Sequence, residues 1–266
     1  MTHALATTPI DPRAEALADL LARAGAAALR RGHEGSVRRK ADGSQVTDAD
    51  LAAHEVLVRG LADLFPRDAV VSEEGAGHGD PAEAEATWWV DPLDGTSAFI
   101  EGLAHWGPTV CRVVDGALEL GALHLPRLGE HWFAAAGAGA WHDGTPLAPQ
   151  AAEGPRTRTV CLPSGSHHLG PLAWRGRSRS LGSSAVHLAQ VAAGGAAASI
   201  VPLWALWDVG CGVLLVRETG GRVTDLEGAD LDVVAHVGTP LVAAHPSVLP
   251  NLLGAVRTSL AGISES

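Results

Sequence analysis

The chain has 266 residues, of which 46% are hydrophobic and 18% charged, so it is long enough to bury a substantial core and has a globular composition. Its formal net charge of -11 disfavours binding to nucleic acid or to an anionic membrane, because both partners need clustered lysine and arginine. No stretch resembles a signal peptide or a bilayer-spanning segment, and the three cysteines are widely spaced, so we expect a cytoplasmic protein with free thiols.

The first half of the sequence is predicted to form two helices followed by strands joined in hairpins. Apolar residues recur at helical spacing from Arg13 to Arg31, and a second helix is expected to start near Thr47, which forms a capping-box pattern with Asp50. The expected strands are Ala69–Ser72, 88–90, 109–114, Ala117–Leu125 and 132–135, with a type I′ turn at Asp115-Gly116 and a second turn at Asp143-Gly144.

The second half alternates helices and strands. Helices are expected at 183–194, 208–219 and 247–260, and strands at 160–162, 196–201, Arg222–Thr224 and Leu241–Ala244. Hairpins in one half and alternation in the other predict a mixed α/β (α+β) protein with layered sheets and helices. We expect a single domain spanning 1–266, with halves of about 13–150 and 151–260.

The segment 88–96 carries the strongest chemical signal. A buried strand is expected to end at Asp91, because Pro92 cannot donate to a strand ladder, and Asp94-Gly95 forms a turn before a short helix that Thr96 caps. Two carboxylates then converge beside the N–H groups of a helix start, which suits Mg²⁺ and a phosphate group. An Asp-rich turn with a helix cap is the plainer interpretation. A phosphatase of the haloacid-dehalogenase type is excluded, because its nucleophilic Asp would stand where this chain has Pro92.

Other acidic residues lie at the ends of neighbouring elements. Glu73 and Glu74 follow a strand, Asp48 stands in the first turn of a predicted helix, and Asp208 begins another. Each has an ordinary explanation, since acids in a first turn stabilise a helix by roughly 0.3–1 kcal/mol and a pair at a strand end is usually solvated. Their combination with Asp91 favours one shared site.

Three sequence blocks contain most of these acids. They are Ser72-Glu73-Glu74-Gly75, then 89–96 (WVDPLDGT), then Trp207-Asp208-Val209-Gly210 with Glu218-Thr219-Gly220-Gly221. In this order they resemble the signatures of the inositol monophosphatase family of Mg²⁺-dependent, Li⁺-sensitive phosphatases, and Val46-Thr47-Asp48 and 181–185 are weaker matches. The resemblance runs from about residue 13 to 258. It implies the layered αβαβα sandwich of the inositol monophosphatase and sugar phosphatase type.

The resemblance also implies metal ligands. One Mg²⁺ is expected on Glu73, Asp91 and the backbone carbonyl of Leu93. A second is expected on Asp91, Asp94 and Asp208, and a third, weaker ion near Glu73. The implied reaction is hydrolysis of a phosphomonoester on a small soluble metabolite.

Catalytic and substrate-binding roles follow from the same resemblance. Asp48 and Thr96, with Glu73, are expected to orient and deprotonate the attacking water. Asp94 and the N–H groups of Gly95 and Thr96 are expected to bind the phosphorylated substrate. Family members are often dimers, so we also expect a homodimer.

Two features leave the substrate open. Relatives are expected to carry an acidic residue shortly before the Trp-Asp pair, where it contacts hydroxyls or an amine of the substrate, and this chain has Val201 there. Arg175, Arg177 and Arg179 form a basic cluster that either contacts a second phosphate or lies in a solvated loop. The candidate substrates are inositol phosphates, histidinol phosphate, fructose-1,6-bisphosphate and 3′-phosphoadenosine 5′-phosphate. A non-catalytic binding relative of the fold is the alternative of a different class.

Overall fold

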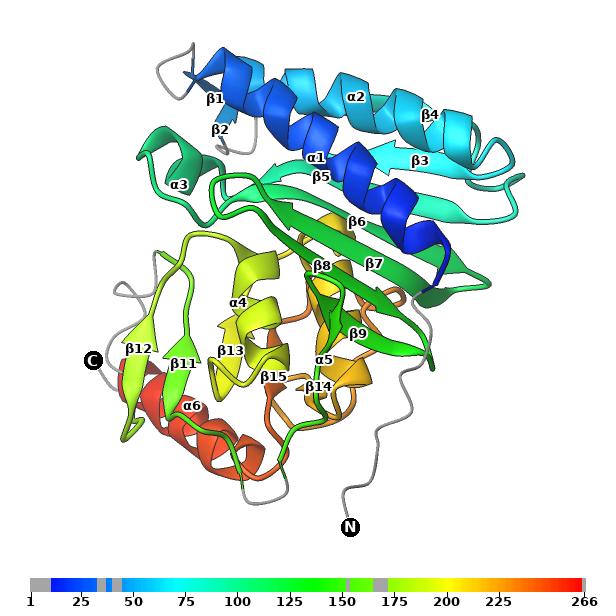
Figure 1. Ribbon diagram of the computed structural model, residues 1–266. Helices are drawn as coiled ribbons and strands as arrows, with labels where there is room; N and C mark the ends of the chain where they lie inside the picture. The colour runs from blue at the N-terminus through cyan, green and yellow to red at the C-terminus, as the bar shows by residue number, and fades with distance from the viewer. Residues whose placement is uncertain (1–10, 33–36, 40–44, 152–153, 165–171, 265–266) are drawn as a thin grey trace.

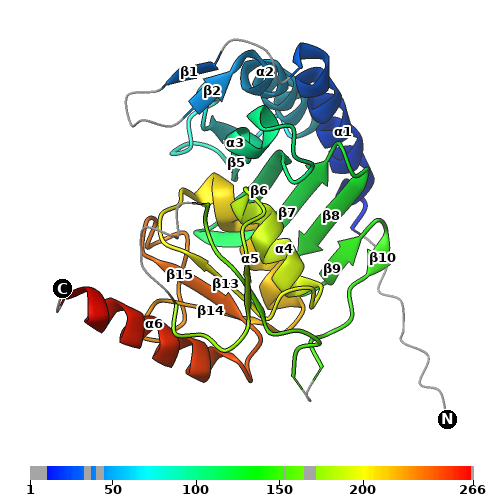
Figure 2. The ribbon, with the colours of Figure 1, turned by 90° about the vertical axis from the view of Figure 1, so that its left-hand side faces the viewer.

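The computed structural model describes residues 11–32, 37–39, 45–151, 154–164 and 172–264. Within them, helices and sheets stack in alternating layers, which confirms the predicted αβαβα arrangement (Figure 1). Two helices cover the outer face of a large sheet, two lie between it and a smaller sheet, and one covers the outer face of the small sheet (Figure 2). In chain order these helices are α1 (Arg13–Arg31), α2 (Asp48–Leu64), α4 (Ser184–Ala192), α5 (Leu206–Glu218) and α6 (Leu249–Ser264).

The large sheet has the strand order β10-β9-β8-β7-β6-β5-β3-β4. Strands β3 and β5 are parallel, and the other neighbours in this sheet are antiparallel. Asp115 and Gly116 both have positive φ, which agrees with the predicted type I′ turn, and the predicted turn at Asp143-Gly144 has the same signs of φ. The strands are β3 (Ala69–Ser72), β4 (Gly75–His78), β5 (Thr87–Asp94), β6 (Gly107–Val114), β7 (Ala117–Leu125), β8 (Glu130–Ala135), β9 (Gly139–His142) and β10 (Thr145–Pro146).

The small sheet has the strand order β12-β11-β13-β15-β14. Its strands are β11 (Thr159–Cys161), β12 (Arg177–Arg179), β13 (Ala198–Val201), β14 (Arg222–Thr224) and β15 (Leu241–Ala244). A separate hairpin joins β1 (Val37–Arg39) to β2 (Gln45–Thr47) just before α2. None of the helices in the described part of the chain is long and apolar enough to cross a bilayer.

Strand β5 packs against different helices on its two faces. Trp88 and Val90 are fully buried in the core under α1 and α2, whereas Trp89 packs on the opposite face and stacks on Trp207 of α5, with ring centroids 5.9 Å apart. Because side chains alternate along a strand, Asp91 lies on the same face as Trp89 and is directed towards α5.

The end of β5 differs from the prediction. The strand does not stop at Asp91 but continues through Pro92 to Asp94, and its pairing with β6 shifts register between Asp91 and Asp94. The ladder therefore passes over the proline, which has no N–H to donate, and resumes at Asp94. Thr96 is the first residue of α3 (Thr96–Ile100) and not its cap; the cap position is held by Gly95 with φ 93°.

Other boundaries differ because the local signals are weak. Helix α5 starts two residues earlier than predicted, at Leu206. The strands β4, β9 and β12 are absent from the predicted set. They are short, and β4 and β12 are rich in glycine or arginine and fully exposed, so neither alternation nor burial marks them in the sequence.

Helix α5 lies unusually close to the large sheet because small residues face each other. A Cβ added to Gly210 of α5 would lie 2.2 Å from Cys111 Sγ on β6, and one added to Gly121 on β7 would lie 2.7 Å from Cys211 Cα. Both cysteines are buried free thiols, as expected. The close approach fixes the position of the helix that carries Asp208.

Gly210→Ala is therefore expected to destabilise the fold by about 1–3 kcal/mol, because the added methyl group forces α5 away from β6. Gly254→Ala is the matched control, since Gly254 lies within α6 and its Cβ would meet nothing within 4 Å. The control should be neutral or stabilise by about 0.5–1 kcal/mol through helix propensity. Urea unfolding measures both, and equal effects would contradict the close packing of α5.

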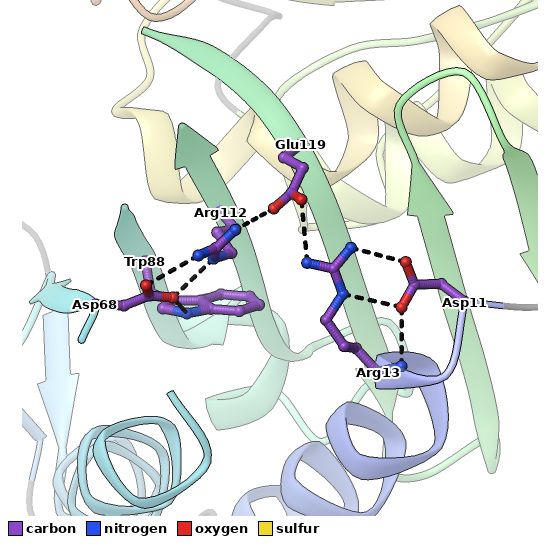
Figure 3. Close-up of polar contacts among 6 residues, drawn as sticks. All are labelled: Asp11, Arg13, Asp68, Trp88, Arg112 and Glu119. Carbon is purple, nitrogen blue, oxygen red and sulfur yellow. Dashed lines mark hydrogen bonds and ion pairs between the residues drawn. The ribbon is translucent and has the colours of Figure 1, made fainter. Parts of the chain in front are cut away.

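A network of charged side chains joins α1 to the large sheet (Figure 3). The buried Asp68 carboxylate accepts hydrogen bonds from Arg112 Nε (2.7 Å) and Nη2 (2.9 Å), and from Trp88 Nε1 (2.9 Å). Arg112 also forms an ion pair with Glu119, which accepts from Arg13 Nη1 at 3.0 Å. The network fixes the start of α1 against the strands that lie beneath it.

Candidate active site

Three carboxylates from separate segments converge at one point. Glu73 follows β3, Asp91 lies near the end of β5, and Asp208 stands in the first turn of α5. One oxygen from each lies within 4.8 Å of the others. Asp91 is only 4% exposed, so the centre of the cluster is shielded from water.

The backbone explains why these side chains meet. The N–H of Glu73 donates to the carbonyl of Val90 at 3.0 Å, which extends the parallel pairing of β3 and β5 and holds Glu73 beside Asp91. The N–H of Ala205 donates to Asp208 Oδ2 at 2.6 Å, which fixes that carboxylate at the start of α5. The acids of this cluster therefore come from the ends of two parallel strands and from the start of one helix. Glu73 and Asp208 are 135 residues apart in the sequence.

The carboxylates perturb one another electrostatically. Burial raises the pKa of Asp91 well above its usual range, and the nearby charges of Glu73, Asp94 and Asp208 raise it further. Burial also raises the pKa of Asp94 to about 6, against the lowering effect of its hydrogen bonds to Ser183 and the start of α4. Crowded carboxylate oxygens that repel one another are stabilised by a hard divalent cation, so this donor set fits Mg²⁺.

Asp94 connects the two halves of the molecule. Its Oδ2 accepts from Ser183 Oγ at 2.5 Å and from the N–H of Ala185 at 2.7 Å, so it caps α4 on the opposite side of the site. Its oxygens are not part of the close group of three acids. Ser183 is a site residue that the sequence marked only through the weakly matching segment 181–185.

Gly95 is confined by its surroundings. Its φ of 93° is unfavourable for other residues, and a Cβ there would lie 3.1 Å from the carbonyl of His105 and 3.2 Å from that of Gly182. Thr96 follows it, with its hydroxyl 3.3 Å from the carbonyl of Leu93. The predicted phosphate-binding residues and the predicted Leu93 ligand therefore lie together in one tight turn.

The carboxylate beside Thr96 is Asp50 and not Asp48. Thr96 Oγ1 donates to Asp50 Oδ1 at 3.2 Å, and Asp50 is only 1% exposed. Asp48 instead forms an ion pair with Arg38 at 3.1 Å, and nearly half of its side chain is exposed. Residues two apart point to different sides of a helix, so only one of these acids faces the turn.

Asp50 was recognisable in the sequence, but only as part of a cap. The capping box with Thr47 is present, since the N–H and hydroxyl of Thr47 donate to Asp50 Oδ2 at 2.8 and 2.5 Å. The other oxygen, Oδ1, is directed to Thr96, and this tertiary contact has no local signature.

The predicted specificity features lie on or beside strands of the small sheet. Arg177 and Arg179 are exposed on β12 at the edge of the small sheet, and Arg175 is exposed just before it. Val201 is buried at the end of β13. No described contact places either feature on the acid cluster.

The layered fold and the carboxylate cluster define an α/β protein with a candidate site for divalent cations. The family model described as the inositol monophosphatase family matches residues 10–261, and the chain belongs to that family, as its motifs predict.

Relatives and solved structures agree with this assignment. The chain is 30% identical over 226 residues to a histidinol-phosphatase of Chlorobaculum parvum, covering 82% of this chain and 85% of the relative. It is 30% identical over 194 residues to a fructose-1,6-bisphosphatase/inositol-1-monophosphatase of Thermotoga maritima, covering 70% and 73%. The structure of a Thermotoga maritima IMPase shares the fold, with a TM-score of 0.84, 24% identity, and coverage of 95% of this chain and all of that one.

Proposed function

We propose that this protein is a Mg²⁺-dependent phosphomonoesterase that hydrolyses a small phosphorylated metabolite with water as the nucleophile. The observation that carries the proposal is the convergence of Glu73, Asp91 and Asp208 within 4.8 Å. Membership of a phosphatase family supports the same activity.

Glu73, Asp91, Asp94, Asp208 and the carbonyl of Leu93 would hold two or three Mg²⁺ ions. When bound, such ions lower the pKa of a coordinated water and offset charge on the phosphate oxygens. Asp94 also anchors the start of α4, so the same carboxylate would hold both halves of the site in place.

Asp50 and Thr96 would handle the proton of the attacking water. A hydroxyl that donates to Asp50 keeps its own oxygen available to accept a proton from water, and Asp50 then receives the threonine proton. Burial raises the pKa of Asp50, which makes its carboxylate a better proton acceptor. We therefore assign to Asp50 the role that the sequence had suggested for Asp48.

This assignment separates two neighbouring acids. Asp50→Asn is expected to lower kcat by about 10²–10⁴-fold, the range that general acid–base groups contribute. Asp48→Asn removes an exposed ion pair with Arg38 and should change kcat by less than about threefold. Steady-state phosphate release at saturating Mg²⁺ measures both, and a larger loss in Asp48→Asn would reverse the roles.

The backbone N–H groups of Gly95 and Thr96, with Asp94, would bind the phosphate end of the substrate. Two relatives, named a histidinol-phosphatase and a fructose-1,6-bisphosphatase/inositol-1-monophosphatase, support histidinol phosphate, fructose-1,6-bisphosphate and inositol phosphates as candidates for the rest of the substrate. The nucleotide 3′-phosphoadenosine 5′-phosphate remains a further candidate.

A panel of these four substrate classes, assayed with and without Mg²⁺, tests the proposal. We expect Mg²⁺-dependent release of phosphate from at least one of them. Cation binding without release from any phosphorylated metabolite would instead favour the non-catalytic alternative. A homodimer is part of the proposal and is measured by light scattering of the intact protein.

A further inference from the structure

Helix α2 contacts the site segments at two points, one helical turn apart. Asp50 contacts Thr96, and His54, four residues later on the same face, places Nδ1 2.8 Å from Ser72 Oγ. Ser72 is the last residue of β3 and directly precedes Glu73. Ser72 is 7% exposed and His54 is half-buried, so this hydrogen bond is partly shielded from water.

The direction of Ser72 is coupled to the direction of Glu73. Successive side chains of a strand point to opposite faces, so a Ser72 side chain directed to α2 turns Glu73 to the face of α5 and Asp208. The backbone agrees with this geometry, since Ser72 pairs with Val90 and the N–H of Glu73 donates to the Val90 carbonyl. A two-residue turn follows at once, because β4 starts at Gly75.

The backbone at this point needs an additional anchor. The pairing of β3 with β4 shifts register between Val70 and Ser72, and β4 is an exposed edge strand. Ser72 does pair with Gly75 after this shift, but the partner strand is itself exposed at the edge of the sheet and has no further strand to support it. A side-chain hydrogen bond to the helix beneath resists rotation of Ser72 about the strand axis.

We propose that His54 is a positioning residue that fixes Ser72 and thereby aims Glu73 at the cation site. This inference rests on the proposed function only in that Glu73 is taken to be a cation ligand. Partners that orient a metal ligand commonly change metal affinity by 10–100-fold when they are removed. The burial of His54 lowers its pKa, which favours the neutral form of the ring.

The test measures cation affinity directly, with Mn²⁺ as the probe and electron paramagnetic resonance to count free Mn²⁺. His54→Ala and Ser72→Ala should each raise the Mn²⁺ dissociation constant by about tenfold or more. The double variant should bind Mn²⁺ no more weakly than the single variants do, because both changes remove the same hydrogen bond. In His54→Asn, the side-chain amide can take the position of Nδ1 and keep a hydrogen bond to Ser72. This variant should therefore bind Mn²⁺ with an affinity within about threefold of the parent protein.

A matched control is available in the small-sheet half. Ser247 Oγ and His245 Nδ1 also lie 2.8 Å apart, in the loop that leads from β15 to α6. Ser247→Ala removes an equivalent histidine–serine bond and should leave Mn²⁺ affinity unchanged. Circular dichroism verifies that the variants are folded, and if His54→Ala does not fold, the smaller Ser72→Ala change carries the test.

Affinities within twofold of the parent in His54→Ala and Ser72→Ala would overturn the inference, as would independent, multiplicative losses in the double variant. The result is separable from the proposed function. A protein that binds Mn²⁺ through this arrangement but releases no phosphate would refute the phosphatase and leave the positioning role intact. An active phosphatase whose variants keep the Mn²⁺ affinity of the parent would support the proposed function and refute the positioning role of His54.

Discussion

Replacing Asp91 with asparagine is expected to stabilise the metal-free protein and to abolish its activity. Burial raises the pKa of Asp91, and the nearby charges of Glu73, Asp94 and Asp208 raise it further. Asparagine has nearly the same shape, and its carbonyl oxygen can still accept the Leu93 N–H that Asp91 Oδ1 accepts at 2.8 Å. The substitution therefore removes like-charge repulsion and keeps the local hydrogen bond.

We expect the melting temperature of metal-free Asp91→Asn to rise by roughly 2–8 °C, which corresponds to about 1–2 kcal/mol for a chain of this size. Phosphate release should fall by at least about a thousandfold, equivalent to about 4 kcal/mol of lost transition-state stabilisation. Mg²⁺ raises the melting temperature of a protein that binds it in the native state, and this rise should disappear in the variant. Scanning calorimetry with and without Mg²⁺, together with a phosphate assay, measures all three effects.

Asp225→Asn serves as the control for removal of one charge from an acidic chain. Asp225 Oδ1 accepts three backbone N–H groups in a tight turn, which an asparagine oxygen can also do, and it lies in the loop after β14. This variant should keep both the activity and the Mg²⁺-induced rise. If metal-free Asp91→Asn is less stable than the parent protein, the carboxylates of the cluster do not repel one another as their positions indicate.

The same feature that makes Asp91 costly for stability also made it recognisable in the sequence. A carboxylate at the end of a strand of Trp and Val is expensive to bury, and the single local hydrogen bond from the Leu93 N–H leaves it beside three other acids. Asp208 is a weaker signal, because an acid in the first turn of a helix also has an ordinary capping role. Residues that conflict with their surroundings are often functional, but Glu73, Asp91 and Asp208 were assigned to one site by their combination and by the order of the sequence blocks that contain them.

The parts of the site that escaped prediction all depend on tertiary contacts. The capping box of Thr47 and Asp50 was recognised, but the second oxygen of Asp50 is directed across the core to Thr96. Ser183 is an ordinary helix cap in the sequence, and only the fold brings its hydroxyl to Asp94. Local pattern fixes which residues start and end an element, whereas these contacts depend on how α2, α4 and β5 are packed together.

A second class of variant should show the reverse behaviour, with stability lost and activity kept. Arg112→Met removes the guanidinium that binds Asp68 through two nitrogens, while the methionine keeps much of the apolar stem (Figure 3). Asp68 has a 4% exposed side chain and would retain only the Trp88 Nε1–H among its present side-chain donors. Leaving a buried carboxylate without its cation costs about 3–5 kcal/mol, or roughly 6–20 °C in melting temperature for a chain of this length.

Two further variants distinguish the effect of leaving Asp68 without its cation from the effect of losing a surface charge. Arg222→Met breaks the Arg222–Asp230 ion pair, whose side chains are 42% and 77% exposed, and should cost less than about 1 kcal/mol. Adding Asp68→Asn to Arg112→Met removes the stranded charge and should recover much of the loss, because a buried pair is costly to break but not always costly to replace. Equal losses in Arg112→Met and Arg222→Met would show that the buried network contributes no more than a surface pair.

The position of this network predicts that catalysis is spared. Arg112 pairs with Trp88 across β5 and β6, on the face that α1 and α2 cover, whereas Asp91 lies on the opposite face of the same strand. Below its melting temperature, Arg112→Met should therefore release phosphate within about threefold of the parent rate, because a substitution that touches no group at the reacting centre leaves the barrier nearly unchanged. Strand β5 separates the two requirements: residues directed to α1 and α2 hold the fold together, and Asp91, directed to α5, would hold the proposed cation.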